Sequence, residues 1–205
     1  MEDNIILYGA SGHCKVIIDI LQSNNQSAFI ILDDNPKLDF VLGFNVIDVK
    51  EFIFCQTQNV ILSIGNNKVR KQLSSKLIAN FVTAIHAKAI VSKHTRIGHG
   101  SVIMAGAVIN PDTQIGLHCI VNTSAIVEHD CVLSDFVHIS PNASLAGGVM
   151  VGEGSQIGIG ATVIQGIKIG RWAIIGAGSI VIKDVPDYAV IVGNPGKIIK
   201  YSNYE

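Results

Sequence analysis

The chain of 205 residues is long enough for one large domain or two small ones, and 48% of its residues are hydrophobic while only 15% are charged. The formal net charge of −1 and the lack of a basic run give no general attraction for nucleic acid. Apolar runs are short and interrupted, and acidic residues precede the first of them, which argues against a membrane span and a secretory signal. We therefore expect a cytoplasmic protein.

Residues 1–84 alternate between apolar runs that suit strands and mixed segments that suit helices. The expected elements are a strand at 4–10, a helix at 11–24, a strand at 28–36, a strand at 59–67 and a helix at 68–80. Strand–helix–strand alternation predicts a parallel sheet covered by helices, so we expect a Rossmann-like α/β domain over residues 1–84. Residues 36–53 show no clear pattern.

A short loop joins the first expected strand to the first helix. Gly9 permits the tight turn, and Gly12 lets a phosphate approach the helix N-terminus, where backbone N–H groups and the helix dipole favour an anion. Ser11, His13 and Lys15 complete the candidate phosphate site. The loop matches neither the dinucleotide fingerprint G-x-G-x-x-G nor the P-loop, so a purely structural turn stays open as an alternative.

Two further loops should meet this one, because the carboxyl ends of neighbouring parallel strands lie at one edge of a sheet. Asp33 and Asp34 end the second strand, about 20 residues after the glycine loop, where an acidic side chain often meets a ribose or a base. Gly65 and Asn66 follow the third strand and add small polar groups. Together these loops predict a pocket for one nucleotide, with no sign of hydride chemistry.

From Ile85 onward an aliphatic residue recurs at every sixth position without a gap. The position two before each is mostly small, and glycine often follows, as at Gly98 and Gly116. A period of six fits neither a helix nor a coiled coil, and it predicts short flat strands with their aliphatic side chains inside a narrow prism. The aliphatic series is Ile85, Val91, Ile97, Ile103, Ile109, Ile115, Val121, Val127, Leu133, Ile139, Leu145, Val151, Ile157, Val163, Ile169, Ile175 and Val181.

Three such sides make a coil of 18 residues, so residues 85–185 should form between five and six coils. The segment after Val181 leaves the repeat, contains two prolines and should cap the last coil. Stacked coils leave flat, fairly apolar walls that are available to neighbouring subunits. We expect a parallel β-helix of hexapeptide repeats with a C-terminal cap over residues 85–205, joined to the first domain without a flexible linker.

His129 is the most distinctive histidine, because the carboxylates of Glu128 and Asp130 flank it. It follows an inward aliphatic residue by two positions, so its side chain should project outward from a coil. Gly147 lies 18 residues later, on the next coil, and should leave a slot for a thin ligand arm. His138, half a coil away, should lie on a different wall and come near a neighbouring subunit's His129 across a threefold axis.

The other histidines and the cysteines receive ordinary interpretations. We expect surface histidines of the early repeats at His86, His94, His99 and His118. We expect buried thiols, with no metal-site or CxxC spacing, at Cys14, Cys55, Cys119 and Cys131.

Five stretches give the whole chain a family resemblance: YGASGHCKVIIDIL, ILDDNP, SIGNNKVRKQL, NTSAIVEHDCVLSDFVHISPNASLAGGV and IGAGSIVIKDVPDYAVIVGNPGKIIK. The chain resembles the NeuD/PglD-like family of sugar O- and N-acetyltransferases, within the hexapeptide-repeat acyltransferase superfamily, and especially its PglD-like members. The resemblance implies a left-handed parallel β-helix and a homotrimer with active sites between subunits. It also implies transfer of an acetyl group from acetyl-CoA to the amine of a UDP-linked 4-amino-4,6-dideoxy sugar.

The resemblance further implies roles for individual residues. His129 is the general base, supported by Asp130, where some relatives have Glu. His138 contacts acetyl-CoA, and Gly147 offers its backbone N–H to the acetyl group. The N-terminal loop binds the diphosphate, while the two aspartates that end the second strand read uracil and ribose. The expected acetyl-CoA site also includes Asn122, Ile157, Gly158 and Lys183, and no metal is expected.

Three alternatives stay open from the sequence. O-acetylation of sialic acid or another free sugar would use the same fold. A zinc hydratase would need three convergent histidines, whereas His99, His118 and His129 share no stacking position. A non-catalytic, nucleotide-sensing trimeric scaffold would not bind acetyl-CoA.

Overall fold

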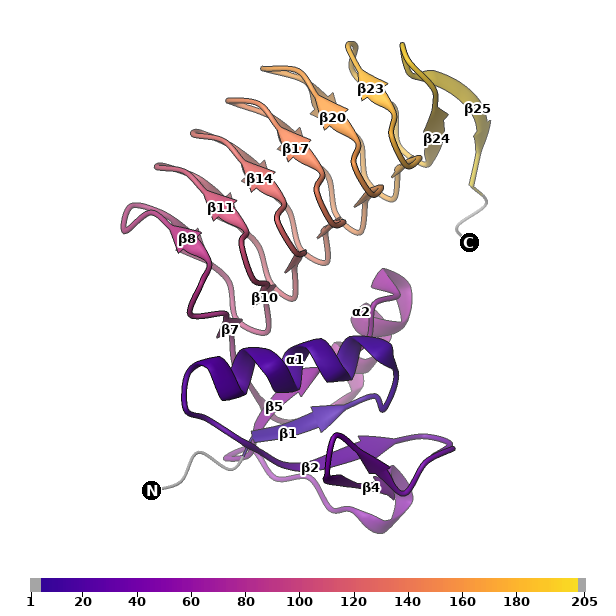
Figure 1. Ribbon diagram of the computed structural model, residues 1–205. Coiled ribbons are helices and arrows are strands. Elements are labelled where there is room, and N and C mark those ends of the chain that lie inside the picture. The colour runs from indigo at the N-terminus through magenta and orange to yellow at the C-terminus, as the bar shows by residue number, and fades with distance from the viewer. Residues whose placement is uncertain (1–4, 203–205) are drawn as a thin grey trace.

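The computed structural model describes residues 5–202 and shows two parts (Figure 1). A small α/β domain lies beside the first coils of a stack of short strands, and this stack curves away toward the C-terminal end. The expected order, an α/β domain followed by a parallel β-helix of hexapeptide repeats, is confirmed.

The α/β domain is built on a six-stranded sheet in the order β3-β4-β2-β1-β5-β6, parallel except for β3. Its strands are β1 (Ile5–Tyr8), β2 (Ala28–Asp33), β3 (Phe40–Val41), β4 (Phe44–Asp48), β5 (Asn59–Leu62) and β6 (Asn80–Phe81). Its helices are α1 (Gly12–Ser23), α2 (Asn67–Lys76) and a short 3-10 turn (Val49–Glu51). The segment that carries no clear sequence pattern forms the β3–β4 hairpin and this 3-10 turn.

The central strand β1 is buried on both faces, as expected for a parallel strand between two layers. Ile5 and Leu7 point to the core that α1 covers. Ile6 and Tyr8 point to the opposite core, which contains residues of the 3-10 turn and of α2. The alternation of side chains along a strand therefore divides one apolar run between two cores.

The β-helix has three walls, and each strand pairs in parallel with the strand 18 residues further on. The first wall contains β7 (Ala84–Ile85), β10 (Val102–Ile103), β13 (Ile120–Val121), β16 (His138–Ile139), β19 (Gln156–Ile157) and β22 (Ile174–Ile175). The second wall contains β8 (Ile90–Val91), β11 (Val108–Ile109), β14 (Ile126–Val127), β17 (Ser144–Leu145), β20 (Thr162–Val163) and β23 (Ile180–Val181). The third wall contains β9 (Arg96–Ile97), β12 (Gln114–Ile115), β15 (Val132–Leu133), β18 (Met150–Val151) and β21 (Lys168–Ile169).

The prism is filled by the aliphatic series from Ile103 onward and by the small residues beside it. At the start of the series Val91 and Ile97 are only partly buried against this core, and Ile85 is exposed, because the first coil has no coil stacked before it. One continuous buried cluster runs from Ile103 to Ile191 and includes Cys119 and Cys131. Cys14 is also buried, but the expectation fails for Cys55, which is exposed in a loop of the α/β domain. The six-residue period therefore predicts the core of the β-helix correctly, because each inward position repeats once per wall.

The α/β domain packs on the first wall. α1 shares a buried apolar core with Ala84, Val102, Met104 and Ile120, which belong to or adjoin β7, β10 and β13. β6 pairs with β5 while β7 pairs with β10, so the chain passes from one sheet to the other between Phe81 and Ala84. Only Val82 and Thr83 lie between these two strands.

Two final strands, β24 (Ala189–Val192) and β25 (Lys197–Tyr201), close the far end of the β-helix. β24 extends the first wall in parallel beside β22, and β25 turns back antiparallel to it. The segment after Val181 thus covers the last coil, as expected. Within residues 5–202, neither the length nor the apolarity of any helix suffices to cross a lipid bilayer.

Candidate active site

Gly9 makes the turn between β1 and α1 possible. Its φ of +113° lies where side chains are disfavoured, and a Cβ there would overlap the Ile64 side chain. The Gly9 N–H donates to the Leu32 carbonyl at 2.7 Å, and the Ser63 hydroxyl donates to the Gly9 carbonyl at 2.6 Å. The turn is therefore fixed by both neighbouring strands.

The N-terminus of α1 offers an open, positively polarised end. Ser11 precedes it in an extended conformation, makes no capping hydrogen bond with its side chain, and no acidic residue lies in the first turn. A Cβ built on Gly12 would meet nothing within 4 Å. Lys15 is exposed in the same turn, and the buried Nε2 of His13 has no hydrogen-bond partner among the described residues. This arrangement suits a phosphate.

The two aspartates after β2 differ in what they bind. Asp33 uses both carboxylate oxygens within the protein, accepting from the Ala10 N–H at 2.8 Å and from the Asn35 N–H at 2.9 Å. Asp34 accepts from the Tyr8 hydroxyl at 2.8 Å through one oxygen, and its other oxygen has no hydrogen bond within the described residues. Burial, with help from Asp34, raises the pKa of Tyr8. Asp33 therefore shapes the loop, while Asp34 keeps an acceptor for a ligand.

The third loop lies beside the first two, because β2, β1 and β5 are adjacent and parallel. Gly65 leaves open space where a side chain would stand. Asn66 caps the N-terminus of α2, and its side chain accepts from the Val69 N–H at 3.1 Å. The structure thus brings all three loops to one edge of the sheet, as the sequence predicts.

His138 projects from the first wall toward this edge. Its Nε2 lies 3.1 Å from Asn122 Nδ2, and the Thr123 N–H donates to Asn122 Oδ1 at 2.8 Å, which orients the amide. Since Asn122 Nδ2 can only donate, His138 Nε2 accepts and the ring proton lies on Nδ1. Burial lowers the pKa of His138 to about 3, with Arg70 and His13 acting in the same direction. The ring is neutral.

His13 of the glycine loop influences His138, so the nucleotide edge and the first wall meet within one chain. Burial lowers the pKa of His13 to about 4, and the positive charge of Arg70 adds to the shift. Both imidazoles are therefore neutral.

His129 lies at the corner between the second and third walls, just after β14, and about two-thirds of its side chain is exposed. Its Nδ1 is 2.7 Å from Asp130 Oδ2. This hydrogen bond, together with the charges of Asp130 and Glu128, raises the pKa of His129. Because Nδ1 serves Asp130, Nε2 is left to accept a proton from a substrate.

Gly147 lies directly against the His129 ring. A Cβ on Gly147 would be 2.6 Å from His129 Cε1 and 2.8 Å from Nε2, distances that no real side chain tolerates. The expected slot beside Gly147 is therefore occupied by the imidazole itself. The glycine sets where the ring lies.

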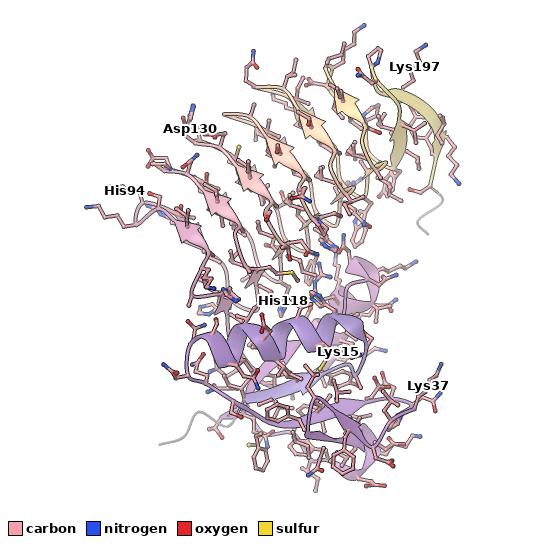
Figure 2. The ribbon with its side chains drawn as sticks, in the orientation of Figure 1. Lys15, Lys37, His94, His118, Asp130 and Lys197 are labelled. Carbon is pink, nitrogen blue, oxygen red and sulfur yellow. The ribbon has the colours of Figure 1, made fainter. Side chains whose placement is uncertain are left out.

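His129 and the nucleotide edge lie on opposite sides of the β-helix within one chain. The α/β domain covers the first wall, and the corner that carries His129 is the one opposite that wall. Figure 2 shows Asp130 at the outer side of the β-helix, away from His118 and Lys15. Within one chain, the nucleotide edge and His138 therefore lie together, whereas His129 lies on the other side of the β-helix.

The remaining expected acetyl-CoA residues differ in what they can offer. The Ile157 side chain is fully buried in the prism. Gly158 is bare because a Cβ would lie 2.5 Å from the Ile175 carbonyl oxygen of the next coil. For these two residues only the backbone could meet a ligand. Lys183 is exposed at the His129 corner, two coils beyond Gly147.

Two of the expected surface histidines are buried, which corrects the sequence interpretation. His118 is stacked on Phe136 and meets Phe81 edge-on, because β6 brings Phe81 onto that corner. His86 lies against α1, with its Nε2 3.6 Å from Asp19 Oδ2. Packing of the α/β domain on the first wall covers both residues. His94 and His99 are exposed, as expected.

A zinc hydratase would need convergent histidines, and the chain separates them. His118 lies at the corner between the third and first walls, whereas His129 lies at the corner between the second and third. No group of three potential metal ligands gathers anywhere in residues 5–202. Within one chain, the histidines that a zinc hydratase would need therefore do not converge.

A parallel β-helix of hexapeptide repeats is the fold of the hexapeptide-repeat acyltransferases, and comparison with known proteins narrows this class. Residues 4–77 match the family model described as the PglD N-terminal domain. UDP-N-acetylbacillosamine N-acetyltransferase of Bacillus subtilis (strain 168) is 42% identical over 111 residues, which are 50% of this chain and 51% of that protein. The match thus spans about half the length of this curated relative.

Two solved structures resemble nearly the whole chain. A histidine variant of perosamine N-acetyltransferase from Caulobacter crescentus, in complex with CoA and GDP-perosamine, is 38% identical, covers 96% of each chain and has a TM-score of 0.89. The acetyltransferase domain of PglB from Neisseria gonorrhoeae FA1090, in complex with acetyl coenzyme A, is 34% identical, covers 97% of this chain and 100% of that one, and has a TM-score of 0.90. The chain belongs to the PglD-like family of sugar N-acetyltransferases.

Proposed function

We propose that the protein transfers the acetyl group of acetyl-CoA to the amine of a UDP-linked 4-amino-4,6-dideoxy sugar, with His129 as the general base. The observation that carries the proposal is the His129–Asp130 hydrogen bond at 2.7 Å, with the imidazole held against Gly147. The relatives support the acceptor class, because one is named for a UDP-sugar and another binds CoA with GDP-perosamine. Both substrates are cytoplasmic metabolites, so we also place the enzyme in the cytoplasm.

The thioester is an activated acyl donor, so direct attack by the amine requires no acyl-enzyme. The amine nitrogen bonds to the thioester carbonyl carbon, and the tetrahedral intermediate loses a proton to His129 Nε2. The C–S bond then breaks, and the proton passes from the imidazolium to the departing thiolate. Asp130 accepts a hydrogen bond from the other ring nitrogen and stabilises the positive charge that forms on the ring. General-base catalysis by His129, with this support, should raise the rate about 100- to 10,000-fold.

Gly147 is suited to support the oxyanion. Its N–H has no hydrogen-bond partner among the described residues, although its carbonyl accepts from the Gly166 N–H at 3.0 Å. A backbone donor aimed at the developing oxyanion contributes about 3 kcal/mol to transition-state stabilisation. His138 and Asn122 would bind acetyl-CoA from the facing wall, and the lowered pKa of His138 keeps its ring neutral.

A homotrimer would complete the site. Within one chain, His129 lies at the corner opposite the wall that carries the nucleotide edge and His138. The outward side chains Ile90 and Ile126 of the second wall are exposed and apolar, as is Met150 of the third. Burial of these walls between three protomers would bring one protomer's His129 toward the next one's His138. Light scattering should give three times the mass of one chain.

For the nucleotide site, we assign the diphosphate to Gly9, Ser11, Gly12, His13 and Lys15. The free oxygen of Asp34 accepts from the base or the ribose, and Asp33 acts by holding the Ala10 N–H. Gly65 and Asn66 line the same edge. UDP is our assignment for the nucleotide, and a guanine nucleotide is the competing outcome of the test below.

The deciding experiment is a free-thiol assay with acetyl-CoA and a panel of acceptors. The panel contains a UDP-4-amino-4,6-dideoxy sugar, its GDP counterpart, CMP-sialic acid and free sialic acid. We expect CoA release with the UDP-amino sugar and a product whose new amide is seen by mass spectrometry. Turnover with sialic acid alone would replace N-acetylation by O-acetylation. No turnover, with no acetyl-CoA binding by calorimetry, would leave the scaffold interpretation.

A further inference from the structure

Arg70 is a buried cation with no carboxylate partner among the described residues. It lies in the first half of α2 and is 1% exposed. Burial lowers the pKa of its guanidinium to about 10. A buried, uncompensated charge destabilises a fold unless hydrogen bonds satisfy it well. The groups that satisfy Arg70 therefore indicate what it does.

The guanidinium bridges the β-helix and the turn that follows β5. On the β-helix side, Nε donates to the His118 carbonyl at 2.8 Å and Nη2 to the Phe136 carbonyl at 3.1 Å, so successive coils are both engaged. On the other side, Nη1 donates to the Ile64 carbonyl at 2.9 Å and to the Gly65 carbonyl at 3.3 Å. One rigid fork thus links two separate parts of the fold.

A second side chain braces this fork. Asn67 Oδ1 accepts from Arg70 Nη2 at 2.8 Å, and Asn67 Nδ2 donates to the Gly154 carbonyl at 3.0 Å. Gly154 lies on the coil after Phe136, so the pair spans three successive coils at one corner of the β-helix. Four of the five groups that accept from Arg70 are backbone carbonyls, so these hydrogen bonds form only when the backbones of the two parts lie in fixed positions relative to each other.

The turn that Arg70 holds touches both halves of the candidate site. Ile64 fills the space beside Gly9, so the turn abuts the phosphate loop. The backbone of Gly65 opposes the lowering of the His138 pKa, so the turn also adjoins His138, whose buried Nδ1 has no hydrogen-bond partner among the described residues. A shift of this turn would therefore change the nucleotide edge and its distance from His138 together.

We propose that Arg70 is a positioning residue, which fixes the Ile64–Gly65 turn against the β-helix and so sets the nucleotide site relative to the wall that carries His138. The inference rests on the proposed function for its kinetic consequence, but its contacts do not. Lysine cannot replace this arginine, because a single ammonium cannot reach the carbonyls of both parts at once.

The test compares Arg70→Lys with Arg171→Lys, a matched change at an exposed arginine of the same corner that binds Asp187 at 2.9 Å. We expect Arg70→Lys to raise the KM for the nucleotide sugar and the Kd for UDP by about tenfold or more. The KM for acetyl-CoA should stay within about twofold, because the wall itself is held by its own strand pairing. Arg171→Lys should change neither constant.

Other outcomes would overturn the proposal. A folded Arg70→Lys protein with unchanged UDP affinity would show that Arg70 only stabilises the fold. An equal rise of both KM values would show general disruption. If Arg70→Lys fails to fold, Asn67→Ala provides the test. It should raise the KM for the nucleotide sugar about threefold and leave the KM for acetyl-CoA unchanged. Equal effects on the two KM values would refute the proposal. Wild-type protein that binds UDP but turns over no sugar would refute the proposed function alone.

Discussion

The position of the His129 ring should depend on the absence of a side chain at Gly147. In Gly147→Ala, the new Cβ would lie 2.6 Å from His129 Cε1, 2.8 Å from Nε2 and 3.2 Å from Nδ1. Ordinary contact begins at 3.4 Å, so the ring must retreat by about 0.8 Å or swing away from the corner. The ring is free to do so, because it is mostly exposed.

The expected cost falls on catalysis rather than on stability. A base displaced by about 1 Å from the reacting nitrogen loses about 100-fold in rate, which corresponds to about 2.7 kcal/mol of transition-state stabilisation. Gly147 does not have a positive φ, so alanine introduces no backbone strain there. We therefore expect kcat in the free-thiol assay to fall about 100-fold while the melting temperature changes little.

The adjacent glycine provides a matched control with the opposite expectation. Gly148 has a φ of +69°, and a Cβ on it would meet nothing within 4 Å. Gly148→Ala should lower the free energy of unfolding by about 1 kcal/mol through backbone strain and leave kcat nearly unchanged. If Gly147→Ala keeps kcat within about threefold of wild type, the placement of the imidazole by Gly147 is refuted.

Two further predictions concern the base and its partner. His129→Ala should lower kcat by about 100- to 10,000-fold with both KM values nearly unchanged, measured by steady-state kinetics; near-normal kcat would remove the general-base role. Asp130 raises the pKa of His129 above its ordinary value of 6.5, and only the neutral ring accepts a proton. The rate should therefore rise with pH as His129 loses its proton at this raised pKa. Asp130→Asn should move this rise in the pH–rate profile to lower pH, and a profile that does not move would contradict the prediction.

Sequence alone predicts the β-helix well, because its core is a one-dimensional pattern. Val127, Leu145 and Val163 are 18 residues apart in sequence and stack in the buried column of one wall. The same arithmetic places Gly147 over His129, and the structure confirms that contact. The division at residues 84 and 85 and the individual binding roles stay predictions.

What the sequence could not provide depends on packing between the two parts of the chain. His118 and His86 look like surface residues in the repeat, yet Phe81 and α1 cover them. Arg70 lies in a polar helix segment that gives no sign of burial, because two of its five acceptors are carbonyls of residues 48 and 66 positions away. Asp33 and Asp34 are likewise indistinguishable in sequence, and only their hydrogen bonds separate a loop-shaping carboxylate from one with a free oxygen.

The separation of His129 from the nucleotide edge within one chain can be tested by complementation. Gly12→Glu places a carboxylate in the open space at the α1 N-terminus, where it repels a diphosphate but is compatible with the helix dipole. This variant and His129→Ala should each be nearly inactive alone. If each site joins the nucleotide edge of one protomer to the His129 of another, refolding the two variants together at equal amounts should restore about one quarter of the wild-type sites. A site contained in one chain would restore none, because every chain in the mixture carries one of the two defects. Activity that stays at the level of the separate variants, in mixtures shown by mass spectrometry to contain both chains in one assembly, would therefore show that the shared site does not exist.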